Sequence, residues 1–133
     1  MQITRQADYA LRAVIFLARM NGDEKASTSA IAEDQKIPPS FLAKIVSQLS
    51  LAGLIQTSRG ARGGVSLAKK PEDISVLDVI EAIDGPVLLN ECAGNPGNCP
   101  FGENCPLQRI WCDTRKELIG RLSSATFARE NVQ

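Results

Sequence analysis

The segment of residues 90–106 constrains the fold of this chain more than any other. Its 17 residues include three glycines, three prolines and four asparagines, a composition that forbids a regular helix or strand. A long loop without secondary structure of its own is usually functional or disordered. Three of the four cysteines of the chain, Cys92, Cys99 and Cys105, lie in this segment. The segment therefore separates a front part from a final part, and it is itself a candidate binding site.

The front part alternates helical periodicity with strand-like runs. Apolar residues recur at helical spacing, and Pro39 favours the start of a helix because a first-turn residue needs no amide donor. Two short apolar runs flank a glycine-rich turn and predict a hairpin. The predicted elements are helices at about 4–20, 28–35 and 40–52 and strands at 54–58 and 64–67. This order is typical of a winged helix-turn-helix domain.

One further helix is predicted before the loop and one after it. Ser75 and Asp78 form the pattern of a capping box, which begins a helix that ends at Gly85. Apolar residues then recur every three or four positions from Leu107 to about Phe127. A small domain does not bury such a long apolar stripe alone, so we expect a homodimer in which two of these helices pack together.

The predicted fold class is mainly α with a small β-hairpin, a winged helix-turn-helix followed by a long C-terminal dimerisation helix. We expect one intertwined domain with a DNA-binding region at 1–70, a connecting helix at 71–89, a cluster-binding loop at 90–106 and a dimerisation helix at 107–128.

Charge is unevenly distributed along the chain. The 15 basic residues balance the 15 acidic ones, but residues 1–70 hold ten basic and five acidic residues, and residues 71–133 hold five and ten. A basic front half suggests a polyanion as its partner. The chain has no histidine, the commonest general base, and no nucleophile-and-base pair is visible, so we expect no enzyme. Arg12 and Arg19 interrupt the apolar stretch 10–20, so we expect a cytoplasmic protein without signal peptide or membrane span.

The candidate DNA contacts lie on the polar side of the third predicted helix and in the hairpin turn. A hydroxyl can bind a phosphate or a base edge, an aromatic ring can contact a thymine methyl, and basic side chains can bind phosphates or enter a narrow minor groove. A protein-binding module with a solvated turn is the alternative interpretation. The predicted DNA-binding residues are Thr28, Ser40, Phe41, Lys44, Gln48, Arg59 and Arg62.

The spacing of the four cysteines favours an iron–sulfur cluster as the cofactor. With Cys112 included, the pattern is C-x6-C-x5-C-x6-C, whereas structural zinc sites usually contain closer pairs. Spacings of five and six residues let the loop pass around a group larger than a single metal ion, and an iron–sulfur cluster is such a group with thiolate ligands. Zinc and metal-free redox thiols remain alternatives. The fourth ligand is open as well, with Cys112 and Asp8 as the candidates. The alternative functions are a small iron–sulfur electron-transfer protein and a zinc-stapled interaction module.

Several motifs together resemble the IscR/NsrR-type transcription regulators of the Rrf2 family. They are the start 1–4 with 8–13, the segment 45–49 leading into 52–55, the turn 59–64 and the three-cysteine loop. The resemblance implies a dimeric winged-helix regulator, expected to be a repressor, of a double-stranded DNA operator. It also implies a [2Fe-2S] or [4Fe-4S] cluster on Cys92, Cys99 and Cys105 that senses nitric oxide, redox state or iron–sulfur status.

The same resemblance bears on the fourth ligand. Regulators of the nitric-oxide-sensing branch carry aspartate at the position of Asp8, contributed from the other subunit, which favours Asp8 over Cys112. The cluster-biogenesis branch uses a histidine where this chain has Gln108, and its specificity-switching glutamate stands where this chain has Ala43. Neither feature of that branch is therefore expected here.

Overall fold

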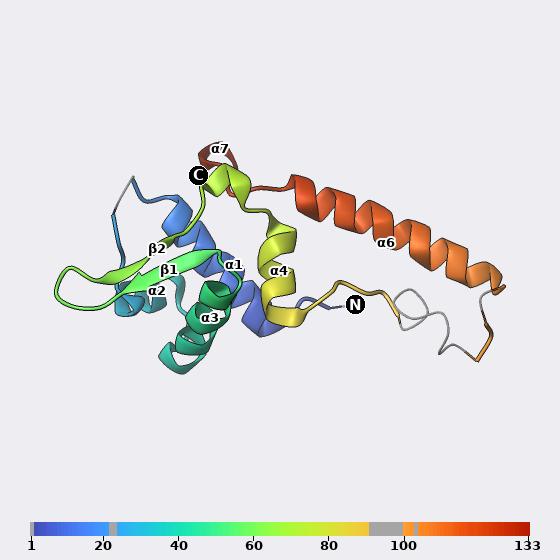
Figure 1. Ribbon diagram of the computed structural model, residues 1–133, viewed down its shortest axis with the longest axis horizontal. Helices are drawn as coiled ribbons and strands as arrows, with labels where there is room; N and C mark the ends of the chain where they lie inside the picture. Colours follow the sequence, from blue (N-terminus) through green and yellow to red (C-terminus); the bar gives the residue numbers. More distant parts are fainter. Residues whose placement is uncertain (1, 22–23, 91–99, 103) are drawn as a thin grey trace.

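Three helices from the front of the chain form the base of the fold (Figure 1). The computed structural model describes residues 2–21, 24–90, 100–102 and 104–133. The helices are α1 (Arg5–Ala18), α2 (Thr28–Gln35) and α3 (Pro39–Leu51). The Thr4 side chain caps α1 by accepting a hydrogen bond of 3.1 Å from the backbone N–H of Ala7, which satisfies one of the free amides of the first turn. All three predicted helices are confirmed.

The core lies between these helices and the hairpin. Its largest fully buried side chains include Val14 of α1, Ile31 of α2, and Leu42, Ile45 and Leu49 of α3. Burying an aliphatic side chain of this size contributes about 1.5–3 kcal/mol. Because this apolar stripe faces the core, the other face of α3 is left exposed to solvent.

A short turn joins α2 to α3. Lys36 adopts a left-handed conformation with φ of 56°, and the backbone N–H of Ile37 donates to the carbonyl of Ala32 at 2.9 Å. Ile37 is buried, and Pro39 then opens α3 as its first residue. The two helices thus form the expected helix-turn-helix.

A two-stranded antiparallel hairpin follows, formed by β1 (Ile55–Ser58) and β2 (Gly64–Leu67). Ala26 exchanges two backbone hydrogen bonds with Val65, of 2.9 and 2.7 Å, and so attaches the segment before α2 to the hairpin. A Cβ atom at Gly63 would lie 2.3 Å from the carbonyl oxygen of Ser58, so only glycine fits at this point of the turn. The hairpin is the wing of the domain.

The chain then passes through a short 3-10 helix, η1 (Pro71–Asp73), into α4 (Val76–Asp84). Both hydrogen bonds of the predicted capping box are present, each of 3.0 Å, between Ser75 and Asp78. At the other end of α4, the hydroxyl of Thr4 donates to Asp84 Oδ1 at 2.6 Å. This contact ties the start of α1 to the end of α4.

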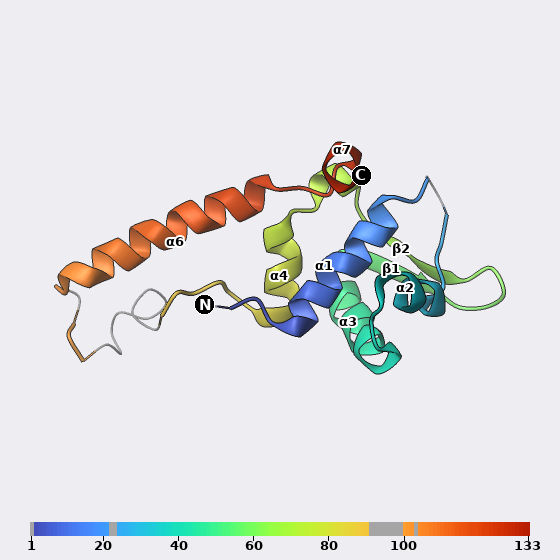
Figure 2. The ribbon, with the colours of Figure 1, turned by 180° about the vertical axis from the view of Figure 1, so that it is seen from behind.

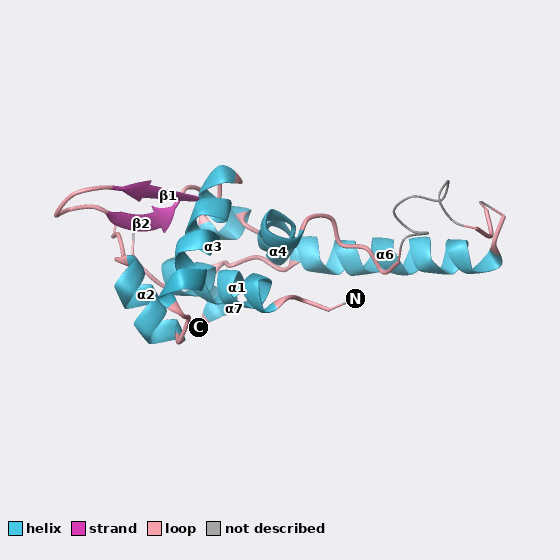
Figure 3. Cartoon of the chain, turned by 90° about the horizontal axis from the view of Figure 1, so that it is seen from below, coloured by secondary structure: helices cyan, strands magenta, loops and turns pink. Residues whose placement is uncertain are grey.

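The long helix α6 (Pro106–Ser124) projects away from the rest of the molecule (Figures 1 and 3). None of its residues, all of which the structure describes, is fully buried. Arg115 attaches it to the segment after α4 by donating from Nε to the carbonyl of Val87 at 2.7 Å. Neither α6 nor any other helix in the described ranges is long and apolar enough to cross a membrane.

The end of α6 differs from the prediction. The helical pattern extends to about Phe127, but the helix ends at Ser124. The next residues form a short bridge with the start of α4, in which Phe127 donates from its backbone N–H to the carbonyl of Ile74 at 3.1 Å. Phe127 is buried in the core rather than exposed on α6, because its backbone pairs with Ile74 and does not continue the helix.

A last helix, α7 (Arg129–Val132), was not predicted from the sequence. It packs near the C-terminal end of α1 (Figure 2), where Arg19 donates from Nε to the carbonyl of Val132 at 2.5 Å. The predicted fold class is confirmed: the structure is mainly helical, with one hairpin and one long C-terminal helix.

Candidate functional site

The exposed face of α3 carries three of the predicted DNA contacts. Ser40, Phe41 and Lys44 are all exposed, on the side opposite the buried stripe of Leu42 and Ile45. The ring of Phe41 packs edge-on against Tyr9 of α1, with the ring centroids 5.9 Å apart. This contact supports the aromatic ring from behind and leaves 38% of the residue accessible.

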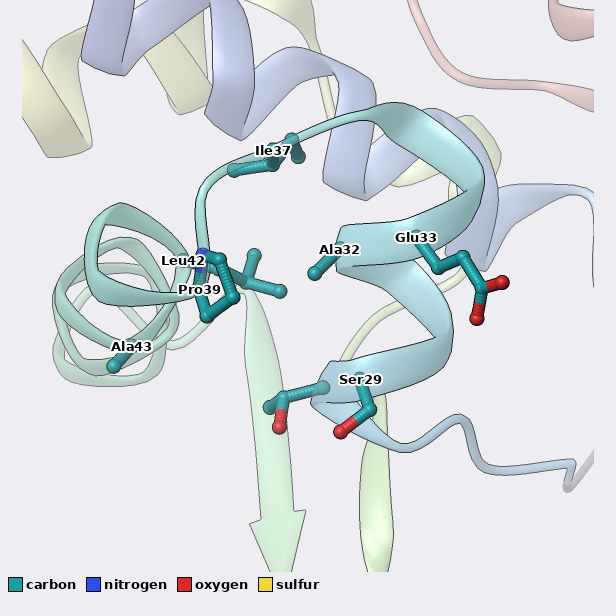
Figure 4. Close-up of a pocket in the computed structure, with 8 residues that line it drawn as sticks. Ser29, Ala32, Glu33, Ile37, Pro39, Leu42 and Ala43 are labelled. Atoms are coloured by element: carbon teal, nitrogen blue, oxygen red, sulfur yellow. The ribbon is translucent and has the colours of Figure 1, made fainter.

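Thr28 lies at the first turn of α2, beside the start of α3. It lines a mainly apolar hollow of about 340 Å³ between the two helices. Figure 4 shows Ala32 of α2 facing Pro39 and Leu42 of α3 across this hollow, whereas Glu33 extends outward. The structure therefore brings Thr28 close to the exposed face of α3.

Gln48 is placed differently from the other predicted contacts on α3. Its side chain is half-buried, and its Oε1 atom is buried without a hydrogen-bond partner in the described part of the chain. An unsatisfied buried oxygen of this kind costs about 1–3 kcal/mol. The position of Gln48 suits packing more than contact with a ligand.

The turn of the wing presents its two arginines to solvent. Arg59 and Arg62 are exposed, and within the described ranges neither side chain has a hydrogen-bond or ion-pair partner. The turn projects beyond the helices (Figure 1). The sequence-based list omitted Lys25, whose Nζ donates to Ser58 Oγ at the end of β1 at 3.0 Å. The bridge between Ala26 and Val65 places this lysine beside the wing.

Asp8 lies in the first turn of α1 and is half-exposed. Its Oδ2 atom accepts a hydrogen bond of 2.9 Å from Arg12 Nε, one helical turn along. The hydrogen bond and the negative charge of Asp8 raise the pKa of the Arg12 guanidinium above its usual value. Asp8 also lines a shallow hollow with Gln2 and Arg5, so its carboxylate is accessible from outside.

The two described cysteines share one hollow at the start of α6. Cys105 directly precedes the helix and Cys112 lies two turns into it, and both are free and half-buried. They line a hollow of about 530 Å³. Cys92 and Cys99 lie outside the described residues.

Sequence reasoning missed two further residues of this hollow, Arg109 and Asp113. Arg109 and Asp113 lie four and eight residues after Cys105, which places them on the helical face that continues from this thiol. That spacing was the available signal.

The structure does not bring Asp8 and Cys105 together within one protomer. The two residues line different hollows, and the start of α6 lies at the far end of the projecting helix, away from α1 (Figure 1). Across the ranges 2–21, 24–90, 100–102 and 104–133, no three cysteine, aspartate or glutamate side chains form a group that could hold a metal ion.

Comparisons with known proteins agree with this architecture. The pattern of the Rrf2 family, described as iron-dependent transcriptional regulators, matches residues 3–129. The HTH-type transcriptional regulator NsrR of Geobacillus kaustophilus is 37% identical over 129 residues, which are 96% of this chain and 88% of that protein.

Two solved structures show the same fold. CymR, the global cysteine regulator of B. subtilis, is 29% identical with a TM-score of 0.78, over 99% of this chain and 95% of that one. IscR of T. potens is 27% identical with a TM-score of 0.76, over 96% and 83%. Because the family pattern covers almost the whole chain and these relatives are transcription regulators with the same winged-helix fold, the chain belongs to the Rrf2 family of DNA-binding transcription regulators and is not an enzyme.

Proposed function

We propose that this protein is a homodimeric transcription regulator, acting as a repressor, whose operator affinity depends on an iron–sulfur cluster in the cysteine loop. The observation that carries the proposal is the location of Cys105. Its free thiol lies at the start of α6, a helix without a buried residue along its whole described length. A helix of this kind needs a partner, and a thiol at its start is available to a cofactor.

The proposed operator contacts combine α3 with the wing. Ser40 and Phe41 contact base edges at the start of α3, whereas Lys44 and the hydroxyl of Thr28 bind phosphates. Arg59 and Arg62 bind phosphates or enter the adjacent minor groove. Gln48 is not included in this contact set, because its side-chain oxygen is buried.

The proposed dimer forms through α6. Leu107 and Ile110 expose 54% and 52% of their surface near its start, and Trp111, Leu118 and Leu122 are only half-buried in one protomer. Packing two such helices together covers the apolar stripe, which supplies the main free energy of association.

The thiol of Cys105 supports the proposal of an iron–sulfur cluster. Thiolates are the ligands such clusters prefer, and Cys105 is free and accessible. Cys92, Cys99 and Cys105 would be three ligands, and Asp8 of the partner subunit the fourth, with Cys112 as the alternative. When bound, the cluster supplies a group that reacts with nitric oxide or oxidants.

Asp8 has a direct structural connection to the DNA-binding face. Its neighbour Tyr9 packs against Phe41 of α3, and the start of α1 is tied to α4 through Thr4 and Asp84. A shift of α1 when Asp8 changes partner would therefore move the support of Phe41. Couplings between two sites are typically about 1–3 kcal/mol.

The presence of the cluster is tested on protein purified without oxygen. We expect a brown protein with iron and acid-labile sulfide, and loss of both in Cys105→Ala. Cys112→Ala is the matched control and should keep them. A colourless protein that contains zinc, or one without metal, would refute the cofactor assignment.

The sensing role is tested by gel shift with cluster-loaded and cluster-free protein on the same operator. We expect the loaded form to bind more tightly, by roughly tenfold, which lies within the usual range of coupling free energies. Equal affinities would leave a DNA-binding protein whose cluster has only a structural role. An iron–sulfur protein without specific DNA binding would instead be an electron carrier.

A further inference from the structure

A second hollow, of about 620 Å³, lies beside the wing and is separate from the contacts proposed above. The C-terminal end of α1, the strands of the hairpin and the segment that leads from β2 to η1 form its walls. Figure 1 shows the end of α1 and this segment above the hairpin, whereas α3 lies below it. A ligand in the hollow would therefore lie across the hairpin from α3.

The hollow is rich in unpaired positive charge. Among the described residues, Lys25, Lys69 and Lys70 line it together with one carboxylate, that of Glu24. Lys69 and Lys70 have no ion-pair or side-chain hydrogen-bond partner among the described residues, and Lys25 donates only to Ser58. Three ammonium groups around one concave surface repel each other, and a bound anion relieves that repulsion.

The remaining walls combine neutral polar groups with apolar ones. Gln56 and Ser66 are directly opposed in the hairpin register, so their side chains lie on the same face and add neutral hydrogen-bond donors. Leu17 and Met20 at the end of α1 and Leu67 at the end of β2 supply apolar surface. A few converging polar groups beside apolar walls are typical of sites for small organic molecules.

We propose that this hollow binds a small organic anion, with a phosphate or carboxylate group held by Lys25, Lys69 and Lys70 and an apolar body against Leu17, Met20 and Leu67. Backbone phosphates of DNA share the anionic chemistry, but the position across the hairpin from α3 favours a free small molecule. The site is independent of the cluster and does not rest on it.

The test is a calorimetric titration of the full chain with phenyl phosphate, with amide shifts from nitrogen-15 spectra to locate the site. We expect saturable binding that shifts the amides of Ser66, Lys69 and Lys70, and weaker binding of inorganic phosphate, which lacks the apolar body. The double variant Lys69→Gln/Lys70→Gln should bind at least about tenfold more weakly, because two charge-assisted hydrogen bonds are lost.

The matched control is Lys36→Gln/Lys116→Gln, which removes the same two charges from exposed positions outside the hollow. Equal weakening in both double variants, or shifts that do not saturate, would overturn the proposal. Operator titrations over a range of salt decide the source of the anion. If Lys69→Gln/Lys70→Gln lowers the salt dependence of operator binding and phenyl phosphate competes with the operator, the surface binds DNA and the small-anion assignment is wrong.

Discussion

At the scale of single residues, Asp8 is paired with Arg12 in one protomer and is the proposed fourth ligand of the cluster in the dimer. In one protomer it accepts a hydrogen bond from Arg12, and both side chains are about half-exposed. Exposed ion pairs contribute little to stability, so this pair is easily exchanged for another partner. Arg12 thus holds the carboxylate in place, but the stability of the fold does not depend on this pair.

We therefore predict that Asp8→Ala and Arg12→Ala have different effects on the lifetime of the cluster but the same small effect on the stability of the fold. Both variants should keep the denaturation midpoint of the cluster-free protein nearly unchanged. Only Asp8→Ala should shorten the lifetime of the cluster, followed by its visible absorption in air. Equal lifetimes in Asp8→Ala and the unaltered protein would remove Asp8 from the ligand set.

Gln48 allows a second prediction at this scale. Its buried Oε1 atom lacks a partner in the described part of the chain, so Gln48→Met, which keeps the shape of the side chain, should raise the free energy of unfolding by about 1 kcal/mol. Urea denaturation measures this change, with exposed Ser47→Ala as the control. Operator affinity should stay the same, and a tenfold loss would show that Gln48 reaches DNA after all.

At the scale of elements, the ends of the helices follow local rules. Gly53 ends α3 with φ of 77°, and Leu54 then donates from its backbone N–H to the carbonyl of Leu49 at 3.0 Å. This left-handed position is costly for residues with a side chain. Gly120, by contrast, lies within α6, and outside its own helix no atom of the described residues would lie within 4 Å of an added Cβ.

The same substitution should therefore have opposite effects at these two glycines. Gly53→Ala should destabilise the protein by about 1 kcal/mol because the left-handed conformation is strained. Gly120→Ala should stabilise α6 by about 0.5–1 kcal/mol because alanine favours a helix interior. Thermal unfolding of both variants measures the two signs, and equal signs would contradict the assigned backbone conformations.

The wing supports a prediction on DNA binding. Arg59 and Arg62 are exposed, and no side chain in the described ranges pairs with either of them. If each binds a phosphate, Arg59→Ala or Arg62→Ala should reduce the slope of log affinity against log salt by about 1. Lys36→Ala, a basic residue of the turn between α2 and α3, is the control. An unchanged slope would exclude phosphate contacts by the wing.

At the scale of the whole molecule, hydrogen bonds at both ends of the connection join α6 to the winged domain. Arg115 holds the segment after α4, and the bridge between Ser75 and Thr126 joins the end of α6 to the start of α4. These contacts, together with its packing on α4, define the direction in which the helix projects. A second copy of α6 would pack against the exposed apolar stripe of this helix.

Dimerisation through α6 is tested by placing a charged side chain on its exposed apolar stripe. Ile110→Lys should weaken the dimer roughly 30-fold, the change that corresponds to an interface loss of about 2 kcal/mol. Leu51→Lys is the matched control, because Leu51 is 87% exposed at the end of α3. Sedimentation equilibrium measures both, and an unaffected Ile110→Lys dimer would place the interface elsewhere.

Much of the fold could be predicted because its signals are local. The cap at Thr4, the capping box of Ser75 and Asp78, and the glycine after α3 each depend on residues within one helical turn. The end of α6 could not be predicted in this way. Phe127 continues the helical period, but the backbone of Ile74, more than 50 positions earlier, takes its hydrogen bond instead.

The candidate site could likewise be predicted only in part. The helical period separated exposed Ser40, Phe41 and Lys44 from the buried face of α3, but it did not show that Gln48 turns inward. It also gave no sign that Lys25 joins the wing, because that placement depends on a bridge between Ala26 and Val65. Contacts between residues distant in sequence leave no periodic signal.

By itself, the sequence determined the family, the order of the elements and the residue types available to DNA and to a cofactor, because caps, turns and helical periods are properties of neighbouring residues. Only the tertiary structure decided that α6 projects without a buried residue along its described length, that Asp8 and Cys105 lie apart in one protomer, and that three lysines surround one hollow beside the wing. Each of these depends on which distant segments pack together, and that is decided by the burial of the shared core.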